Sequence, residues 1–377
     1  NCSNLTEITL PSSLTSIGEY AFQSCTSLAT VTFAEGSQLE SIGDNAFSYC
    51  SVLTEITLPS SLTSIGYSAF SGCSSLTEIT LPSSVTSIGR SAFSNCSNLT
   101  EITLPSSLTS IGEYAFSGCY ALALVINNSS TLTITKDSSD NGNVGYYAKE
   151  VVNNGATAQG RIEIIDNVQY YINDITGDFI ALSPVNREIA NIVIAKGAKE
   201  IEQYAFYECS SLTKVTLPSS LTSIGSYAFS SCSSLATVTF AEGSQLKSIG
   251  DHAFYNCSNL TEITLPSSLT NIERSAFESC SSLATVTFAE GSQLKNIGDS
   301  AFYGCSSLAT VTIESEDVYK VATSATSAGY LLQYATTVRV PTRIVEENDN
   351  SYLENTVNFT TSVDGVYTVF TKVQGQQ

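Results

Sequence analysis

Every cysteine in this chain of 377 residues occupies the same position of a repeating sequence unit. Neighbouring cysteines are 23 or 25 residues apart, except for one interval of 90 residues between Cys119 and Cys209. A fixed period of this length is typical of a solenoid, because each unit is one supersecondary turn that cannot bury its apolar face alone. The sequence therefore predicts stacked coils instead of a single globular core. The eleven cysteines are Cys2, Cys25, Cys50, Cys73, Cys96, Cys119, Cys209, Cys232, Cys257, Cys280 and Cys305.

The charge balance argues against two classes of partner. The chain carries 35 acidic and 15 basic residues, for a formal net charge of −20. Nucleic acids and anionic membrane surfaces both attract stripes of Lys and Arg, and the sequence has no such stripe. No stretch approaches the roughly 18 to 20 apolar residues of a membrane span. We therefore expect no nucleic-acid partner and no direct membrane insertion of this segment.

The chain begins inside a repeat, and the sequence shows no signal peptide. Residues 1–14 read NCSNLTEITLPSSL, and the same letters recur at 95–108 and 256–269. A natural start within a repeat is unusual, so we expect a fragment or a processed form of a longer protein.

Residues 76–98 show how one 23-residue unit builds a coil, LTEITLPSSVTSIGRSAFSNCSN. Apolar and β-branched residues predict a short strand over 76–81, and Pro82 ends it because proline has no amide donor. A second extended piece follows, and Gly89 allows a bend. The stretch RSAFSNC then predicts one helical or 3₁₀ turn that buries its Ala, Phe and Cys side chains.

A 25-residue variant keeps this skeleton and lengthens one corner. In residues 28–52 the segment FAEGSQL takes the place of LPSSL, and an insertion at a corner leaves the inward residues in register. Stacked coils place identical side chains above one another at about 4.7–4.9 Å, so phenylalanine should form one buried column in each of two runs. Complete units begin at Leu5, Leu28, Leu53, Leu76 and Leu99, and again at Ile189, Leu212, Leu235, Leu260 and Leu283.

Two segments break the period, and each follows a run of five complete units. In the first we expect a strand at 132–135 and a β-meander over 161–182 that turns at 174–178. In the second we expect a short helical pattern, a strand at 336–340 and a hairpin that turns at Asp364-Gly365. Open solenoid ends expose apolar rungs, so capping is the natural role of both segments. The predicted organisation is a first array (1–126), an irregular insert (127–188), a second array (189–313) and a C-terminal cap (314–377).

The repeats resemble the leucine-rich repeats of BspA-like proteins. The units LTEITLPSSLTSIGEYAFSGC and FAEGSQLKSIGDHAFYNCSNL carry the resemblance, which covers roughly two thirds of the chain. It implies a right-handed leucine-rich repeat solenoid of short parallel strands with helical or 3₁₀ turns. It also implies a surface or secreted protein of host-associated bacteria or parasitic protozoa that adheres to host proteins or other cells. The family has no catalytic residues and no fixed ligand-binding motif to carry over.

Three features that could carry chemistry have simpler structural explanations. The cysteines are better explained as small buried core residues than as disulfides, because disulfides require converging Cβ vectors and these side chains point the same way. His252, the only histidine, occupies an outward, variable position without a nucleophile and carboxylate that would complete a triad. We expect no enzyme activity, no cofactor and no metal. Two acidic clusters lack the ligand spacing of an EF-hand, namely Asp137/Asp140 and Glu346/Glu347/Asp349.

The outward columns of the first strand form the candidate binding surface. Two residues after the first leucine of each unit, the first array carries mostly glutamate, and a threonine column runs two residues further on. A ladder of strand-forming residues that merely keeps the face soluble is at least as good an explanation. The second array carries a nearly neutral mixture, Asn191, Lys214, Thr237, Glu262 and Thr285. We expect basic or polar partners at the first array, bound by Glu7, Thr9, Glu55, Thr57, Glu78, Thr80, Glu101 and Thr103.

Sequons of the form Asn-x-Ser/Thr predict surface glycans if the protein passes through a eukaryotic secretory pathway. Most of them belong to the repeated NCSNLT segment. The candidate asparagines are Asn4, Asn95, Asn98, Asn127, Asn128, Asn256, Asn259 and Asn358.

Two functions follow from such a surface. The first is an extracellular or cell-surface adhesion module that binds host or neighbouring-cell proteins along its strand face. The second is a structural protein whose copies stack end to end into a fibre or coat, because an uncapped first rung is a template for the edge of another chain. A strictly monomeric particle would remove the second.

Overall fold

The computed structural model describes residues 2–153, 155–316, 318, 322, 330–347, 359–364 and 366–372. Contacts between Cα atoms divide the chain into two compact units. Each unit is a stack of coils, and the predicted solenoid is confirmed. The first unit comprises Asn1–Ile164, Gln169–Asp178 and Leu182–Val185, and the second comprises Ile165–Val168, Phe179–Ala181 and Asn186–Gln377.

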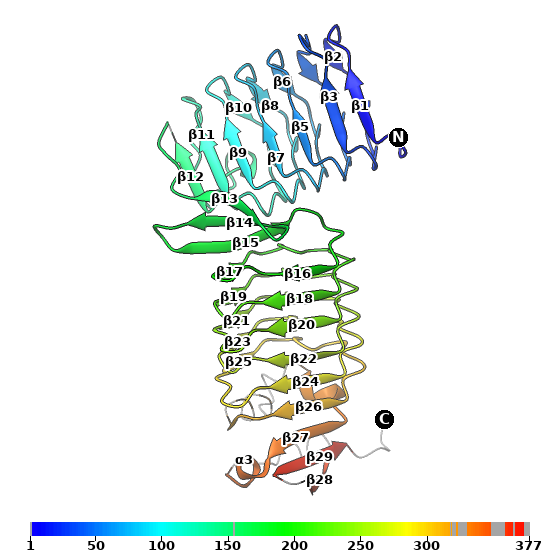
Figure 1. Cartoon of the computed structure of the whole chain (residues 1–377), viewed down its shortest axis with the longest axis vertical. Coiled ribbons are helices and arrows are strands. Elements are labelled where there is room, and N and C mark those ends of the chain that lie inside the picture. Colours follow the sequence, from blue (N-terminus) through cyan, green and yellow to red (C-terminus); the bar gives the residue numbers. More distant parts are fainter. Residues whose placement is uncertain are drawn as a thin grey trace. The chain divides into compact units, whose positions relative to one another are not determined.

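In the first unit, one strand from each coil joins a parallel sheet that forms one face of the stack (Figure 1). Corresponding residues of neighbouring coils pair, so that Glu55 lies beside Glu78 and Ile56 beside Ile79. Side chains alternate along a strand, and the isoleucines point into the core. The strands of this sheet are β1 (Glu7–Leu10), β3 (Thr30–Phe33), β5 (Glu55–Thr57), β7 (Glu78–Thr80), β9 (Glu101–Leu104), β11 (Leu124–Asn127) and β12 (Glu150–Asn153).

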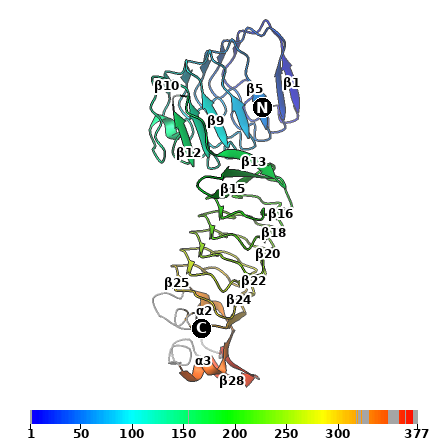
Figure 2. The same ribbon diagram turned by 60° about the vertical axis from the view of Figure 1, so that its left-hand side comes forward.

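A second row of two-residue strands runs along another side of the same coils (Figure 2). Each consists of a serine followed by the isoleucine of the repeat, which is buried in all but the last strand. The two rows hold neighbouring coils together on separate sides of one core. In the first unit this row is β2 (Ser16–Ile17), β4 (Ser41–Ile42), β6 (Ser64–Ile65), β8 (Ser87–Ile88) and β10 (Ser110–Ile111).

Phenylalanine forms the predicted column in both units. Neighbouring rings are nearly parallel with centroids 5.1 to 5.4 Å apart. Burial of one such side chain contributes about 1.5–3 kcal/mol, and offset stacking adds to it. All of these rings are fully buried except that of Phe22, which ends its column. The columns are Phe22, Phe47, Phe70, Phe93 and Phe116, and Phe206, Phe229, Phe254, Phe277 and Phe302.

The A-F-x-x-C corner is not the helical turn that the sequence predicts. Its amide groups alternate between two kinds of acceptor. Ser91, Phe93 and Asn95 donate to carbonyl groups of the next coil, while the residues between them donate three positions back. A 3₁₀ helix uses the second kind alone. Because Ser91 and Asn95 adopt positive φ angles of 55° and 60°, the backbone zigzags and this side of each coil is also bonded to its neighbour.

The glycine that follows the second strand serves close packing and not the bend that we expected. A Cβ atom on Gly89 would lie 2.6 Å from the backbone carbon and oxygen of Gly66 in the preceding coil. Glycine is favoured where two backbones approach so closely. Glu202 and Glu273 stand at this position in two coils of the second unit, so the preference is not absolute.

The insert first extends the face sheet of the first unit. β11 pairs with β9, and β12 pairs with β11 in parallel, so the sheet continues past the predicted boundary at residue 126. The strand expected at 132–135 is not formed. Instead the short 3₁₀ helix η1 (Asn141–Asn143) closes the corner, where Gly142 accepts the amide of Phe116 at 2.7 Å.

The meander predicted over 161–182 is confirmed. It consists of β13 (Arg161–Ile165), β14 (Val168–Asn173) and β15 (Asp178–Pro184), which are neighbours in one sheet. Ile180 and Ala181 of β15 pair in parallel with Glu200 and Ile201. These two residues of the meander therefore begin the short-strand row of the second unit.

The second unit repeats the same construction and ends differently. Its face sheet continues from β26 to β27, as predicted for 336–340, and an antiparallel hairpin follows. The turn glycine, Gly365, lies outside the described residues. The face strands are β16 (Asn191–Val193), β18 (Lys214–Leu217), β20 (Thr237–Phe240), β22 (Glu262–Leu265), β24 (Thr285–Phe288), β26 (Thr310–Ile313), β27 (Thr337–Pro341), β28 (Phe359–Asp364) and β29 (Tyr367–Lys372). The short row is β17 (Glu200–Ile201), β19 (Ser223–Ile224), β21 (Ser248–Ile249), β23 (Asn271–Ile272) and β25 (Asn296–Ile297), and the helices are α2 (Leu331–Tyr334) and α3 (Thr342–Glu347).

Candidate binding surface

The face strands of the first unit hold the candidate binding residues in two columns. Parallel pairing aligns Glu55 with Glu78 and Thr57 with Thr80. Alternate side chains of a strand point to opposite faces, so these residues point outward from the core. The role of the columns in binding stays a prediction. The exposed candidate residues of these columns are Glu7, Thr9, Glu55, Thr57, Glu78 and Thr80, and Thr30 and Thr32 of β3 are exposed between them.

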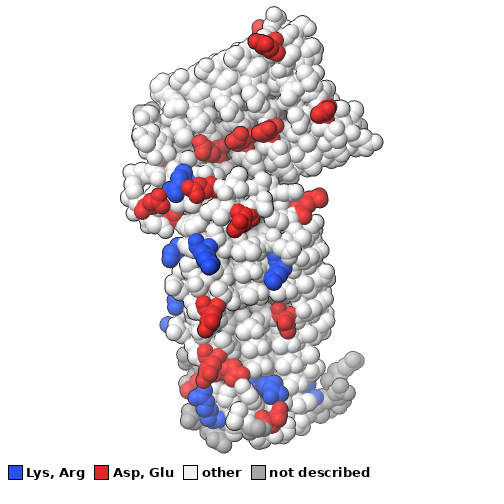
Figure 3. Space-filling model, viewed as in Figure 1, with Lys and Arg blue, Asp and Glu red and all other residues white. Residues whose placement is uncertain are grey.

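Acidic side chains dominate the outer column of the first unit. Figure 3 shows a row of them across this unit, and three successive face strands contribute Glu55, Glu78 and Glu101. Like charges on neighbouring strands are unfavourable for the pairing. A cationic side chain of a partner placed over the row would relieve the repulsion, so the row fits a basic or polar protein better than an acidic one.

One end of this surface is less open than we expected. Glu101 and Thr103 are half-buried. Ile162 and Ile164 of β13 lie beside them and share with them the lining of a cavity of about 460 Å³. Burial, and to a smaller extent the nearby Glu78 carboxylate, raises the pKa of Glu101. The fully open part of the acidic column therefore ends at Glu78.

Gln169 of β14 fastens the insert to the coil, a role that no pattern in the sequence indicates. Its side-chain nitrogen donates to the backbone oxygen of Asn98 (3.3 Å) and to Oγ of Ser183 (2.9 Å). Its Oε1 accepts a hydrogen bond from Oγ1 of Thr100 at 3.4 Å. Nδ2 of Asn98 donates in turn to the backbone oxygen of Pro184 at 3.1 Å. Buried polar groups such as these are costly to leave unpaired.

The face of the second unit carries a different column. Asn191 pairs with Lys214, and Lys214 with Thr237. Glu262 pairs with Thr285, and threonines continue the column through β26 and β27. One positive and one negative side chain among neutral residues give this face no strong preference for the charge of a partner.

The cysteine ladder is reduced, as predicted, and it is part of the core. All eleven cysteines are free, and ten are buried. In eight coils Sγ donates to the backbone oxygen of the phenylalanine in the preceding coil at 3.1–3.2 Å, as Cys96 does to Phe70. Burial raises the pKa of Cys119 to about 12, so this thiol does not supply a nucleophilic thiolate near neutral pH. Cys2 is exposed, and for this residue the expectation of burial is wrong.

His252 is not the outward residue that we expected. Its ring is half-buried and stacks on the ring of Tyr227 with centroids 4.6 Å apart. Tyr227 stacks in turn on Tyr204 at 4.9 Å. His252 also has a positive φ of 54°, like the equivalent residues of other coils. These contacts show that the histidine packs in the corner of the coil, where its role is structural.

The remaining acidic clusters show no metal centre within the described residues. Among those residues, no group of three or more His, Cys, Asp or Glu side chains could hold a metal ion. Asp137 and Asp140 are exposed. The side chains of Glu346, Glu347 and Asp349 lie outside the described part of the chain. In that part, the helices are also too short or too polar to cross a membrane.

The sequons differ in their accessibility. Asn98 and Asn127 are buried, and their side chains donate to the backbone oxygens of Pro184 and Leu132. The fold therefore leaves no room for a glycan at either residue, contrary to the expectation. Asn358 lies outside the described residues. The exposed candidates, for which glycosylation stays a prediction, are Asn4, Asn95, Asn128, Asn256 and Asn259.

Comparison with protein families identifies the repeats. The model of the BspA type leucine-rich repeat region matches in six copies, over residues 1–123, 185–309 and 243–352. These ranges cover well over half of the chain. A search of curated proteins finds no match.

Several solved structures are similar to the chain. A leucine-rich cell-surface protein of Faecalibacterium prausnitzii is 29% identical, over 81% of this chain and 78% of that one, with a TM-score of 0.41. The pneumococcal vaccine antigen PcpA is 27% identical, over 82% and 68%, with a TM-score of 0.42. A leucine-rich repeat protein of T. pallidum is 32% identical, over 41% and 72%, with a TM-score of 0.37. The TM-scores are below 0.5, and the family assignment does not depend on these structures.

Proposed function

The chain belongs to the family of BspA-type leucine-rich repeat proteins, and on this basis we propose that it is a non-enzymatic protein-interaction module of a cell-surface or secreted protein. Its partners are extracellular or host proteins with a basic or polar surface. The binding surface is the open strand face of the first unit. Its residues are Glu7, Thr9, Glu55, Thr57, Glu78 and Thr80, with Glu101 and Thr103 at the half-covered end.

The exposed acidic column on a rigid sheet is the observation that carries this proposal. Glu55 and Glu78 stand on strands that are already paired, so little backbone order remains to be gained on binding. The residues between them anchor the strands in the core. Complementary charge accelerates association and disfavours partners of the same sign.

Adhesion of the purified protein to cultured epithelial cells tests the proposal. The triple variant Glu7→Gln, Glu55→Gln, Glu78→Gln should bind several-fold less than the wild type, and added salt should weaken the wild type more than the variant. Treatment of the cells with protease should abolish binding, because the proposed partner is a protein.

A matched variant removes the same charge from elsewhere in the first unit. Glu19, Glu35 and Glu40 are exposed and lie outside the face strands. Their change to glutamine should leave adhesion unchanged. An equal loss in both triple variants would show that net charge matters and the face does not, and would reject the proposal.

End-to-end assembly into a fibre or coat stays a prediction. It depends on the outer edge of β1, and no observation among the described residues favours a second copy there. Sedimentation at several protein concentrations measures it directly, and a particle that remains monomeric would remove it.

A further inference from the structure

The face sheet opens at two equivalent steps of the solenoid. Where a 23-residue coil precedes a 25-residue coil the sheet is closed, since β1 pairs with β3, and β22 with β24, over four residues each. Pairing is also short between two 23-residue coils, where β7 meets β9 at Thr80 and Thr103 alone. Where a 25-residue coil precedes a 23-residue coil the sheet is open and the two corners differ in length. β3 pairs with β5 over only two residues, and β20 and β22 belong to different sheets.

Two features of the sequence explain the opening. In the 25-residue coil an alanine follows the strand, and its amide donates to the preceding coil, as Ala34 does to Leu10 and Ala241 to Leu217 at 2.9 Å each. In the 23-residue coil that comes next, Pro59 or Pro266 takes this position, and proline has no amide hydrogen. The FAEGSQL corner is also two residues longer than the LPSSL corner, so the two chains diverge after the strands.

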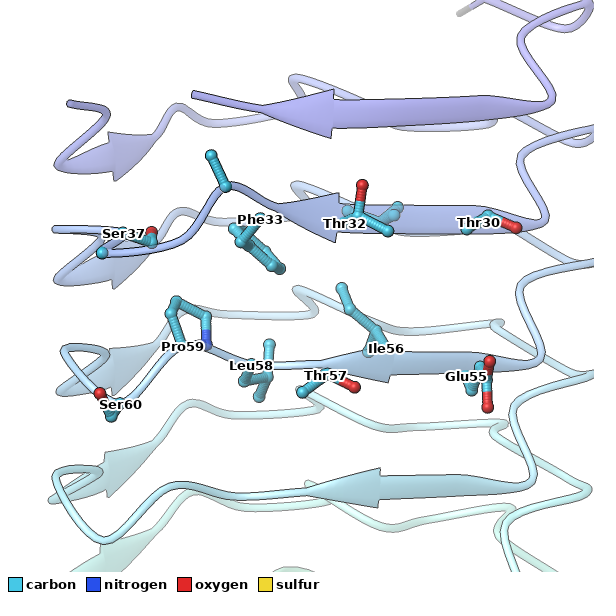
Figure 4. Close-up of a pocket in the computed structure, with 13 residues that line it drawn as sticks. Thr30, Thr32, Phe33, Ser37, Glu55, Ile56, Thr57, Leu58, Pro59 and Ser60 are labelled. Carbon is cyan, nitrogen blue, oxygen red and sulfur yellow. The ribbon is translucent and has the colours of Figure 1, made fainter. Parts of the chain in front are cut away.

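Each opening is a pocket that uncovers an aromatic ring. The pockets have volumes of about 410 Å³ between β3 and β5 and 430 Å³ between β20 and β22. Figure 4 shows the side chains of Phe33 and Pro59 in the gap between the two strands of the first pocket. Phe33 and Phe240 are partly exposed. Phe288, at the same position of the third 25-residue coil, is fully buried where β24 pairs with β26 over four residues.

The two pockets offer the same chemistry. The first is lined by the phenylalanine and proline rings, by threonine side chains that include Thr32 and Thr57, and by the single carboxylate of Glu55. Each of these residues has an identical counterpart 207 positions later in the second pocket. The second pocket is lined in addition by Glu242 and Ala289. The shared part of the lining follows from the repeated order of the two coil types.

This lining favours one class of ligand. The residues that line the pockets include carboxylates but no Lys or Arg, so phosphate, sulfate and carboxylate ligands are disfavoured. An extended peptide can add as a strand only beside a row of free backbone groups. The first half of β3 is already paired with β5. Beside the second half, Pro59 interrupts the row of backbone groups. Threonine and serine hydroxyls both donate and accept hydrogen bonds. A compact, uncharged ligand with many hydroxyl groups and one apolar face fits these features.

We propose that the two pockets are binding sites for neutral sugar rings of glycans. The apolar face of a pyranose packs on Phe33 or Phe240, and its hydroxyl groups bond to the threonine hydroxyls and to Glu55 or Glu262. This inference goes beyond the proposed function, because the second pocket contains no residue of the acidic column of the first unit.

Saturation-transfer NMR of the whole chain tests the sites, with lactose, cellobiose and N,N′-diacetylchitobiose as probes. At least one of these disaccharides should receive saturation at its ring protons, and calorimetry should find two sites per chain. Phe33→Ala and Phe240→Ala should each weaken one site about tenfold, the effect expected of one lost aromatic contact. The double variant should weaken both.

Isosteric variants separate lost binding from lost folding. Thr57→Val and Thr264→Val keep the shape of the strand and remove one hydroxyl from each pocket, and they should also weaken binding. Thr287→Val makes the same change where the sheet is closed and should leave binding unchanged.

Three results would overturn the proposal. They are the absence of binding by all three disaccharides at millimolar concentration, unchanged binding in the double phenylalanine variant, and stronger binding of 3′-sulfated lactose than of lactose. None of them would affect the proposed function, because the double variant Glu7→Gln, Glu78→Gln changes no residue of either pocket and measures adhesion through the acidic column independently.

Discussion

The two units are built from the same type of coil and the same pattern of core residues, yet the side chains on their strand faces differ. In the first unit the outer column is acidic, and its end is half-covered by residues of the insert. In the second unit the column is mixed in charge and continues through β26 to β27. The buried phenylalanine, cysteine and isoleucine positions are the same in both. A solenoid can vary its face because outward residues are not part of the stacked core.

The segment NCSNLT shows most clearly how its surroundings change the environment of one residue, because it occurs in both units with identical letters. In the first unit Asn98 is buried and bonded to Pro184. In the second unit Asn259 is exposed. The same residue in the same coil position therefore has two environments, and variants can measure the difference.

The largest effect should be equal in the two units and come from the phenylalanine columns. Phe93 and Phe254 are fully buried, and each stacks on a ring above and a ring below. Phe93→Ala or Phe254→Ala should lower the free energy of unfolding by about 3–5 kcal/mol, measured by chemical denaturation. Phe22→Ala, at the partly exposed end of a column, should cost less. A small loss in one unit alone would show that the two cores are not equivalent.

An intermediate effect should distinguish the units. Asn98→Ala leaves buried partners unsatisfied and should cost about 1–3 kcal/mol in the free energy of unfolding. Asn259→Ala changes an exposed residue and should stay within about 0.5 kcal/mol. Thermal or denaturant unfolding of both variants provides the measurement. Equal losses would mean that the bond to Pro184 does not stabilise the first unit.

The smallest effect should depend on pH and involve Glu101. Its pKa is raised above the unfolded value, so its favourable contribution is complete below the unfolded pKa and is lost as the pH rises through the folded pKa. At neutral pH, Glu101→Gln should therefore stabilise the protein, by less than about 1 kcal/mol because solvent screens a half-exposed group. The gain should disappear in acid.

The matched variant for this pH effect is Glu262→Gln, at the equivalent and exposed position of the second unit. It should show no comparable dependence of the melting temperature on pH. A destabilised Glu101→Gln protein at neutral pH would contradict the role assigned to the insert.

Much of the coil could be predicted because its signals are local. Pro82 marks the end of a strand, Phe93 recurs at one phase of the period, and the alternation in the tail predicts its hairpin. The prediction of a helical turn at the corner was wrong. RSAFSNC has the local pattern of such a turn, but half of its amides bond to the next coil. The role of Gln169 could not be predicted, because no residue near it in the sequence indicates a contact with Asn98.

The candidate site was predictable in part for the same reason. Alternation along the strand predicts that Glu55 and Glu78 point outward, and the structure exposes both. The half-buried state of Glu101 depends on β13, which is about 60 residues away along the chain. The two pockets depend on which coil type comes next, and this order has a meaning only once the coils are stacked.

The solenoid, its period and its inward-facing side chains follow from the repeated unit alone, because every unit has the same strand, corner and apolar pattern. Which copies of identical residues are exposed, covered or separated follows only from the folded chain. A coil is surrounded by the coils above and below it and by any segment that packs across its face, and the sequence of one unit specifies none of these neighbours.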